Sequence, residues 1–328
     1  MKQEQFVQHY QPLWDRFNEW LDYQQLSKRQ QRLSAEPDID FPQTYRQICH
    51  HLALAQSRMY SPLLIEQLNQ LVIRGHNRLY TSRLHFLHHV AEFYLRDFPQ
   101  LVRQSSRALL LAAMLFFGSL FTMIIAIQIE PELVYSVLNG EQVASMETMY
   151  DPARTTRFGR EREADSDVLM FGFYIRNNTG IGFQVFAGGL LYGLGSVFFL
   201  LYNGLTIGAV AGHLTEIGYT ETFWGFVAGH SAFELTAIVL SGIAGFKLAE
   251  ALIMPKRKSR LLALRDNSQQ AVKIVYGAAT LFIMAAFVEA FWSSQTWIPV
   301  VVKYSVGITL WLLVIAYFIF AGRERHAT

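Results

Sequence analysis

Several features are scarce in this sequence, and each scarcity excludes something. The only cysteine, Cys49, rules out a disulfide framework within the chain. Charged residues make up 16% of the chain, well below the ~25% usual in soluble domains. The formal net charge is only +2 and no basic block occurs, so we expect no nucleic-acid partner. The first residues, MKQEQFVQHYQPLWDRF, lack the apolar core of a signal peptide, so we expect the first membrane segment to direct insertion.

Motifs that carry enzyme chemistry are also missing from the sequence. It has no phosphate-binding loop, no Gly-rich dinucleotide turn and no nucleophile elbow. The pair Gly188-Gly189 lies inside an apolar run, where helix packing explains it better than phosphate binding. We therefore expect no cofactor and no enzymatic activity.

Apolar residues are plentiful, at 52% of the chain, and unevenly distributed. Residues 1–104 are rich in Gln, Arg and His, and Phe6, Leu13 and Phe17 begin an apolar stripe at helical spacing. Residues 105–328 are rich in Phe, Gly, Ala and Leu. The sequence therefore predicts an all-α fold, with an N-terminal soluble helical domain at 1–104 and a polytopic helical membrane domain at 105–328 that has five or six membrane segments.

Apolar runs of about 18 or more residues are long enough to cross a hydrocarbon core of ~30 Å. We predict spans at residues 108–129, 181–202, 222–254, 272–292 and 297–320. Asn203-Gly204 is a helix-breaking signal, so residues 205–213 are expected to form a short broken or re-entrant helix. If residues 205–217 cross the membrane the chain has six crossings, and if they re-enter it has five; both readings stay open.

The segment at about 130–178 holds more acidic than basic residues and cannot lie in lipid. Within it, DVLMFGFYI at 167–175 is apolar enough for an amphipathic helix at the membrane interface, and a solvated loop packed on the spans is the alternative. Arg103 and Arg107 precede the first span, PKRKSR at 255–260 follows a later one, and the C-terminus is also basic. Because basic flanks stay in the cytoplasm, we expect a cytoplasmic N-terminus and an extracytoplasmic segment at 130–178.

Four ionisable side chains fall where lipid would penalise them: His213, His230, Glu234 and Glu289. His230 and Glu234 are four residues apart and share a helix face. Because a charge at mid-bilayer costs ~2.5 kcal/mol or more, these groups should face the bundle interior. They predict either a proton relay, ion site or polar cavity, or a buried hydrogen-bonded pair that fixes helix register. A metal hydrolase with Glu289 or His213 as third ligand is a further alternative, but the signal is weaker than HExxH and we expect no metal.

Three stretches of the sequence resemble a known family: NNTGIGFQVFAGGLLYGLGSVFFLLYNGLTIGAV, HSAFELTAIVLSGIAGFKLAEALIMP and AAFVEAFW. They resemble the stage II sporulation protein M family. The stretch YRQICHHLALAQSRMYSPLLIEQLNQLVIRGHNRLY looks like its version with a long cytoplasmic domain from non-sporulating Gram-negative bacteria. The family's Asn-Gly corresponds to Asn203-Gly204, its His-x-x-x-Glu to His230 and Glu234, and its late-span Glu to Glu289. Ser231 is a departure, since many relatives carry Gly there.

The resemblance implies a bacterial inner-membrane protein with about five or six spans, surrounded by membrane lipid. The family is named for a scaffold-like member that works with peptidoglycan-degrading partners, and relatives such as this chain look like those encoded beside AAA-type ATPases and von Willebrand-type domain proteins. It supplies no molecular activity, and sporulation is not carried over. We favour a scaffold that organises partner proteins on the cytoplasmic side, in cell-envelope processes. The alternative is a channel or transporter with a polar site formed by His230, Glu234 and Glu289. The glycine-rich faces also predict a homo-oligomer.

Overall fold

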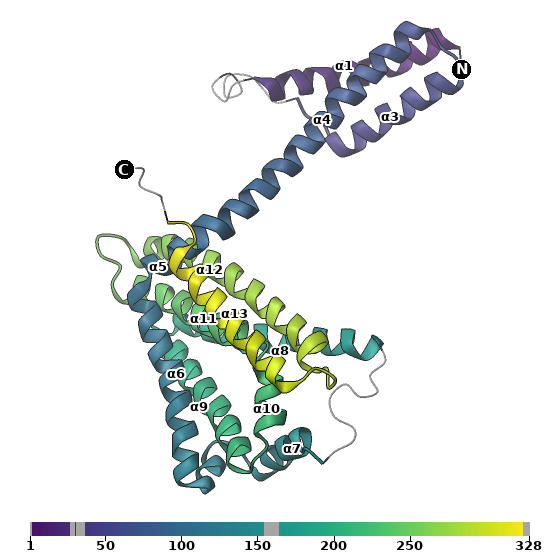
Figure 1. The fold of residues 1–328 in the computed structure, drawn as a ribbon. Coiled ribbons are helices and arrows are strands. Elements are labelled where there is room, and N and C mark those ends of the chain that lie inside the picture. Colours follow the sequence, from purple (N-terminus) through teal and green to yellow (C-terminus); the bar gives the residue numbers. More distant parts are fainter. Residues whose placement is uncertain (1, 27–29, 31–36, 154–163, 324–328) are drawn as a thin grey trace, which may run out of the picture. The chain divides into compact units, whose positions relative to one another are not determined.

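The computed structural model describes residues 2–26, 30, 37–153 and 164–323. These residues are helical apart from turns and connections, and none of them forms a β-strand, which confirms the predicted all-α fold. The chain divides into two compact units, Met1–Ala91 and Glu92–Thr328 (Figure 1). Each unit has a hydrophobic core of its own.

The first unit is built from helices α1 (Gln3–Gln25), α3 (Phe41–Ser57) and α4 (Pro62–Glu92). Asp40 caps α3, because its side chain accepts a hydrogen bond from the Gln43 N–H at 3.2 Å. One face of each helix supplies the core: Phe6, Trp14, Phe17, Leu21, Ile48, Ala55, Leu64, Leu68 and Leu71. Trp14 also donates a buried hydrogen bond to His51 Nδ1 at 3.1 Å, so a polar contact joins α1 to α3.

The second unit contains the helices that follow. The π-helix η1 (Phe93–Asp97) and α5 (Phe98–Gln104) lead into α6 (Ser106–Ile129), η2 (Pro131–Ser136) and α7 (Gly140–Tyr150). Beyond residues 154–163, which lie outside the description, come α8 (Ala164–Ala187), η3 (Gly188–Leu190), α9 (Leu194–Glu216), α10 (Thr220–Val227) and α11 (Ser231–Ile253). The last helices are α12 (Arg260–Val288), the π-helix η4 (Glu289–Ser293) and α13 (Val300–Phe320).

Among the described residues, five helices are long and apolar enough to cross a membrane: Ser106–Ile129, Leu194–Glu216, Ser231–Ile253, Arg260–Ser293 and Val300–Phe320. Large apolar side chains such as Leu110, Phe121 and Leu312 are exposed on them, as expected of helices that contact lipid. The chain is therefore a membrane protein, as predicted. Helix α5, which the sequence analysis assigned to the N-terminal region, packs against α12 and α13 of the second unit.

Helix α9 is continuous through Asn203 and Gly204, so the predicted helix break at this pair and the short helix at 205–213 are wrong. The Asn203 side-chain amide donates to the Phe199 carbonyl one turn earlier, at 2.7 Å. Gly204 lies against α6, where a Cβ would come within 2.1 Å of Ser119 Oγ. The missing side chain at Gly204 therefore permits close helix packing and does not serve a turn.

The chain turns earlier, between α8 and α9. Gly193 has a φ of +85°, a left-handed conformation that favours glycine. Gly189 approaches α11 so closely that a Cβ would lie 2.1 Å from the Gly245 carbonyl oxygen. The predicted span at 181–202 is wrong for this reason, because the turn divides it between the end of α8 and the start of α9.

Helix α8 runs alongside α11 and α12, and it contains the stretch 167–175 that the sequence left open between an interfacial helix and a loop. Tyr174 packs with Ala286 of α12 and Ala290 of η4, so this stretch is buried in the unit on one side. Nearer its end, Gly182 lies against Phe282 of α12, where a Cβ would meet the ring at 2.4 Å.

Close contacts also give the direction of each helix. Gly204, Gly208 and Gly212 of α9 contact residues of α6 in rising order, namely Phe116, Leu120 and Ile124, so the two helices run parallel. Parallel neighbours need a return passage between them, and α8 provides it. Together with the five apolar helices, α8 gives six passages along the unit within the described residues, although α8 itself is not among the helices long and apolar enough to cross a membrane. The sixth passage is thus α8, and residues 205–216 are the second half of α9.

Six passages bring the start of α6 and the end of α13 to one end of the unit. Arg103 donates to the Phe318 carbonyl at 2.8 Å and Gln100 donates to the Gly322 carbonyl at 2.6 Å. The α11–α12 connection lies near α5 at this end (Figure 1). We call it the basic end, after Arg103, Arg107, Lys256, Arg257, Lys258 and Arg260. The acidic end, opposite, carries Glu130, Glu132, Glu141 and Glu221.

Candidate functional site

Three of the four ionisable residues singled out by sequence come together in the second unit. One ligand atom each of His230, Glu234 and Glu289 lies within 4.8 Å of the others. His230 is the residue before α11, and its Nε2 lies 3.7 Å from Glu234 Oε2 one turn later. Glu289 comes from the first residue of η4. We call these three residues the polar cluster.

The π-helix η4 positions Glu289. It is a five-residue interruption at the end of α12, and such insertions often occur at functional sites. The turn before α11 approaches η4 closely because Gly229 has no side chain. A Cβ at Gly229 would lie 2.4 Å from Cζ3 of the Trp292 ring. The backbone geometry of η4 and the absence of a side chain at Gly229 therefore bring Glu289 close to His230 and Glu234.

Polar contacts around η4 hold the cluster in place. His230 Nδ1 and Ser293 Oγ are 3.1 Å apart, which fixes the orientation of the imidazole ring. The buried Lys303 of α13 donates to the Ser293 carbonyl at 2.7 Å. Trp311, also on α13, donates to Ser231 Oγ at 3.2 Å. Ser231 thus joins the start of α11 to α13.

Two buried polar atoms beside the cluster lack a hydrogen-bond partner among the described residues. They are Glu289 Oε2 and Asn178 Nδ2. Glu289 is 9% exposed and Asn178 is 2% exposed, and the two side chains interact with each other. An unsatisfied buried polar group costs about 1–3 kcal/mol, and more when it is charged. The arrangement is therefore one that a bound species would stabilise.

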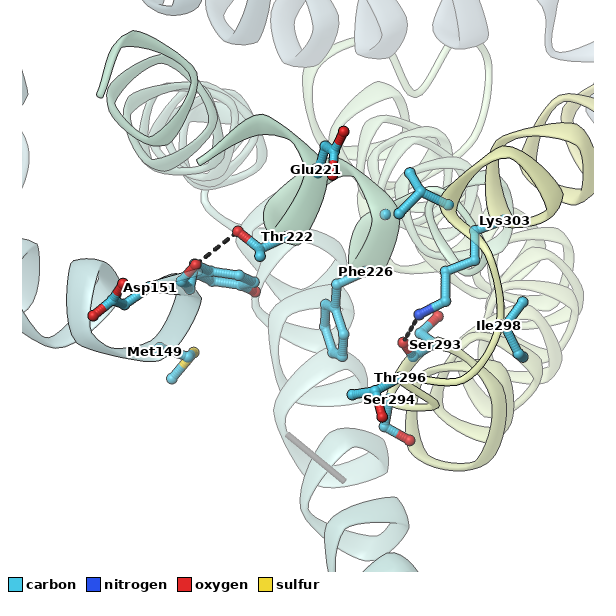
Figure 2. A pocket seen from close by; sticks show the side chains of 13 residues that line it. Met149, Asp151, Glu221, Thr222, Phe226, Ser293, Ser294, Thr296, Ile298 and Lys303 are labelled. Atoms are coloured by element: carbon cyan, nitrogen blue, oxygen red, sulfur yellow. Dashed lines mark hydrogen bonds between the residues drawn. The ribbon is translucent and has the colours of Figure 1, made fainter. Parts of the chain in front are cut away.

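A pocket at the acidic end lies beside the cluster, and Figure 2 shows the side chains that line it. Its volume is about 90 Å³, enough for a few water molecules. The end of α7, helix α10, the segment after η4 and the start of α13 line it, with Phe226, Ser293 and Lys303 pointing inward. The Phe226 ring packs on the His230 ring with centroids 5.3 Å apart. Phe226 and Ser293 therefore line the pocket and also contact His230 of the cluster.

Tyr150, at the end of α7, belongs to both the pocket and the surroundings of the cluster. Burial raises the pKa of its phenol, and the nearby Glu289, Tyr174 and Glu234 raise it further. The phenol therefore stays protonated and able to donate a hydrogen bond. Thr222 of α10 donates to the Tyr150 carbonyl at 2.7 Å and holds the end of α7 over the pocket (Figure 2).

Toward the basic end, apolar packing closes the site. Ala237, Ile238 and Leu240 of α11 follow Glu234 in the sequence and are at most 1% exposed. They belong to one core cluster with Phe282 of α12 and residues of α6, α8 and α9. The polar cluster thus lies beside a pocket that shares Ser293 and Phe226 with its surroundings, and a packed core separates it from the basic end.

The other predicted site residues lie elsewhere. His213, near the end of α9, pairs with Glu147 of α7, with Nε2 and Oε1 2.8 Å apart, and it is not part of the polar cluster. Asn203 and Gly204 lie at the α6–α9 contact. Sequence reasoning missed Lys303, although a lysine within the apolar run VVVKYSVGITLWLLV was a signal of the same kind as Glu289.

Comparison with known proteins agrees with the resemblance seen in the sequence. The profile described as "Stage II sporulation protein M" matches residues 107–294, more than half of the chain, and includes the polar cluster. A profile described as "Domain of unknown function (DUF8413)" matches residues 4–81. An uncharacterized protein of Methanocaldococcus jannaschii is 26% identical over 128 residues, 38% of this chain and 71% of that protein. No solved structure matches the chain. From the extent of the first match, this chain belongs to the stage II sporulation protein M family.

Proposed function

We propose that the membrane unit is a transporter that binds a small cation at the polar cluster and carries it across the bacterial inner membrane. The observation that supports this most is the position of His230, Glu234 and Glu289, between a pocket at one end and packed apolar side chains at the other. Charged groups within a membrane are costly and occur mainly where a solute or proton is handled. A buried polar site with a cavity beside it on one side and packed side chains on the other has the asymmetry expected of one state of an alternating-access cycle.

The orientation follows from charge. Basic residues flanking spans stay in the cytoplasm, so we propose that the basic end and the first unit face the cytoplasm. The pocket then opens to the extracytoplasmic side, where the acidic residues of the opposite end attract cations. Solute would reach the cluster from outside, past Tyr150 and Phe226.

Flux measurements in proteoliposomes test the proposal. Cation and proton flux would be compared for the wild type, Glu234→Gln and His230→Ala, with Glu147→Gln as the matched control from the other His–Glu pair. Thermal melting in detergent establishes that each variant is folded. We expect flux in the wild type and the control and none in folded cluster variants. Equal flux in all folded proteins, or none in any, would count against a transporter.

A scaffold that organises partner proteins is a second candidate function. The observation in its favour is the surface of the first unit. This unit has its own core, and Met59 and Leu63 in the α3–α4 region expose 89% and 82% of their surface. Exposed apolar side chains of this kind are suited to contact with a partner protein. We propose that partners bind residues 40–100, and that the chain forms homo-oligomers and has no enzymatic activity. Crosslinking from residues 40–100 in cells tests this proposal. If no specific partner is captured, the scaffold function is contradicted.

A further inference from the structure

We propose that His230, Glu234 and Glu289 form a binding site for a divalent first-row metal ion such as Mn²⁺ or Zn²⁺. The imidazole nitrogen and two carboxylates are ligands that such ions accept together. That the transported solute is such a metal ion rests on the proposed transport function. That the cluster binds such an ion rests on the arrangement of the cluster alone.

Distances within the cluster fit a metal better than a hydrogen-bonded pair. His230 Nε2 and Glu234 Oε2 are 3.7 Å apart, which is too long for a hydrogen bond. Ligands about 2.1 Å from a tetrahedral metal lie about 3.4 Å from one another. All three candidate ligand atoms are within 4.8 Å, so small side-chain shifts bring them to that spacing. The polar cluster is thus nearly preformed for a metal.

The second nitrogen of His230 has the partner that a metal ligand needs. Metal-binding histidines usually donate the other ring N–H to a neighbouring oxygen, which leaves the lone pair of the first nitrogen directed at the metal. Ser293 Oγ is in that position, 3.1 Å from Nδ1. With Nδ1–H as the donor, Nε2 presents its lone pair to the space between the carboxylates.

Glu289 supplies a second, independent observation. Its Oε2 is buried and has no hydrogen-bond partner among the described residues, although the side chain is only 9% exposed. A cation at the cluster would satisfy this carboxylate. Asn178 lies beside Glu289, and its side chain interacts with the Glu289 carboxyl group and is placed to orient it.

Charge balance favours a divalent ion over a monovalent one. Two carboxylates within 4.8 Å in a buried site repel each other unless positive charge is present. One divalent ion neutralises both. The Lys303 ammonium donates to the Ser293 carbonyl at 2.7 Å (Figure 2).

The first test is Mn²⁺ binding to the purified full-length protein in detergent. The electron paramagnetic resonance signal of free Mn²⁺ falls on binding and gives the stoichiometry and the affinity. We expect one ion per chain and competition by Zn²⁺. Glu289→Gln, which keeps the shape of the side chain, should weaken binding by at least about 100-fold, and Ser293→Ala by about 10–100-fold, as for other residues that orient a ligand.

Glu147→Gln is the matched control, since it changes the other His–Glu pair of the unit and should leave Mn²⁺ affinity unaltered. Electron spin echo measurements on wild-type protein add a test that needs no variant. Bound Mn²⁺ should show coupling to a histidine ¹⁴N, and absence of that coupling would overturn the proposal. Equal affinity in Glu147→Gln and Glu289→Gln would overturn it as well.

Outcomes for binding and for transport can be told apart. Mn²⁺ binding that depends on Glu289, without Mn²⁺ flux in proteoliposomes, would support the metal site and contradict the transporter. Flux of protons or Na⁺ by protein that binds no Mn²⁺ would overturn the metal site while the transport function stands.

Discussion

Gly229→Ala should destabilise the membrane unit because it adds a methyl group between the α10–α11 turn and η4. The added Cβ would lie 2.4 Å from Cζ3 and 2.7 Å from Cε3 of the rigid Trp292 ring. Overpacking of this kind costs about 1–3 kcal/mol. For a unit of this size, a change of 1 kcal/mol shifts the melting temperature by about 2–4 °C, so we expect a fall of roughly 2–12 °C. The displaced turn should also weaken whatever the polar cluster binds.

Gly225→Ala provides the control for this substitution. Gly225 lies one turn earlier, in α10, and a Cβ there would meet only Val300 methyl groups at 3.6 and 3.7 Å, an ordinary contact. Because alanine favours a helix over glycine by about 1 kcal/mol, Gly225→Ala should be neutral or stabilising. Thermal melting of both variants in one detergent is the assay. An unchanged melting temperature for Gly229→Ala, or equal losses for both variants, would refute the argument that η4 requires a glycine opposite it.

Three further predictions address the helix packing, the first unit and the topology. Gly204→Val should prevent stable packing of α9 on α6, because a Cβ would lie 2.5 Å from the Phe116 carbonyl oxygen. We expect the variant to lose the monodisperse peak of the wild type in size-exclusion chromatography. Burial lowers the pKa of His51, and the neighbouring His50 and His9 lower it further. The first unit should therefore keep its full stability above the unfolded-state pKa of about 6.5 and lose stability as the pH falls below it. We expect backbone amides of α3 to exchange hydrogen faster at pH 5 than at pH 7.5, and we expect His51→Gln to abolish this difference. The topology can be tested by cysteine labelling in a Cys49→Ser background. Glu141→Cys should react with an impermeant maleimide added to intact cells, and Arg257→Cys should not. Reaction of both variants would place both residues outside the cell and contradict six passages.

Much of the fold could be predicted from the sequence, because apolar runs and basic flanks are local signals. The runs at 108–129 and 297–320 coincide closely with α6 and α13. Helix α8 was missed because its polar residues, among them Arg176 and Asn178, hide a helix whose apolar side packs on α11 and α12. Its burial depends on α11 and α12, which come much later in the sequence, and no local pattern reveals such partners.

Glycine was the least predictable residue type, because the same residue can break a helix or allow two helices to approach. At Asn203-Gly204 the sequence favours a turn, but Gly208 and Gly212 continue the spacing of Gly204 along one face, and that face meets α6. The turn occurs at Gly193, which has the positive φ. Only the spacing of the three glycines, read as a helix face, could have distinguished the two roles.

The cluster shows a similar limit. His230 and Glu234 could be paired from their spacing, but the position of Glu289 depends on η4, whose wider turns change the direction in which later side chains point. No residue type marks a π-helix. One glycine in the α10–α11 turn and one on α13 make this geometry possible. Gly229 admits Trp292 of η4, and Gly307 of α13 lies against the Ala228 carbonyl, where a Cβ would be 2.5 Å away. The turn that carries His230 is thus packed against η4 at Gly229 and against α13 at Gly307, so the position of His230 depends on both elements.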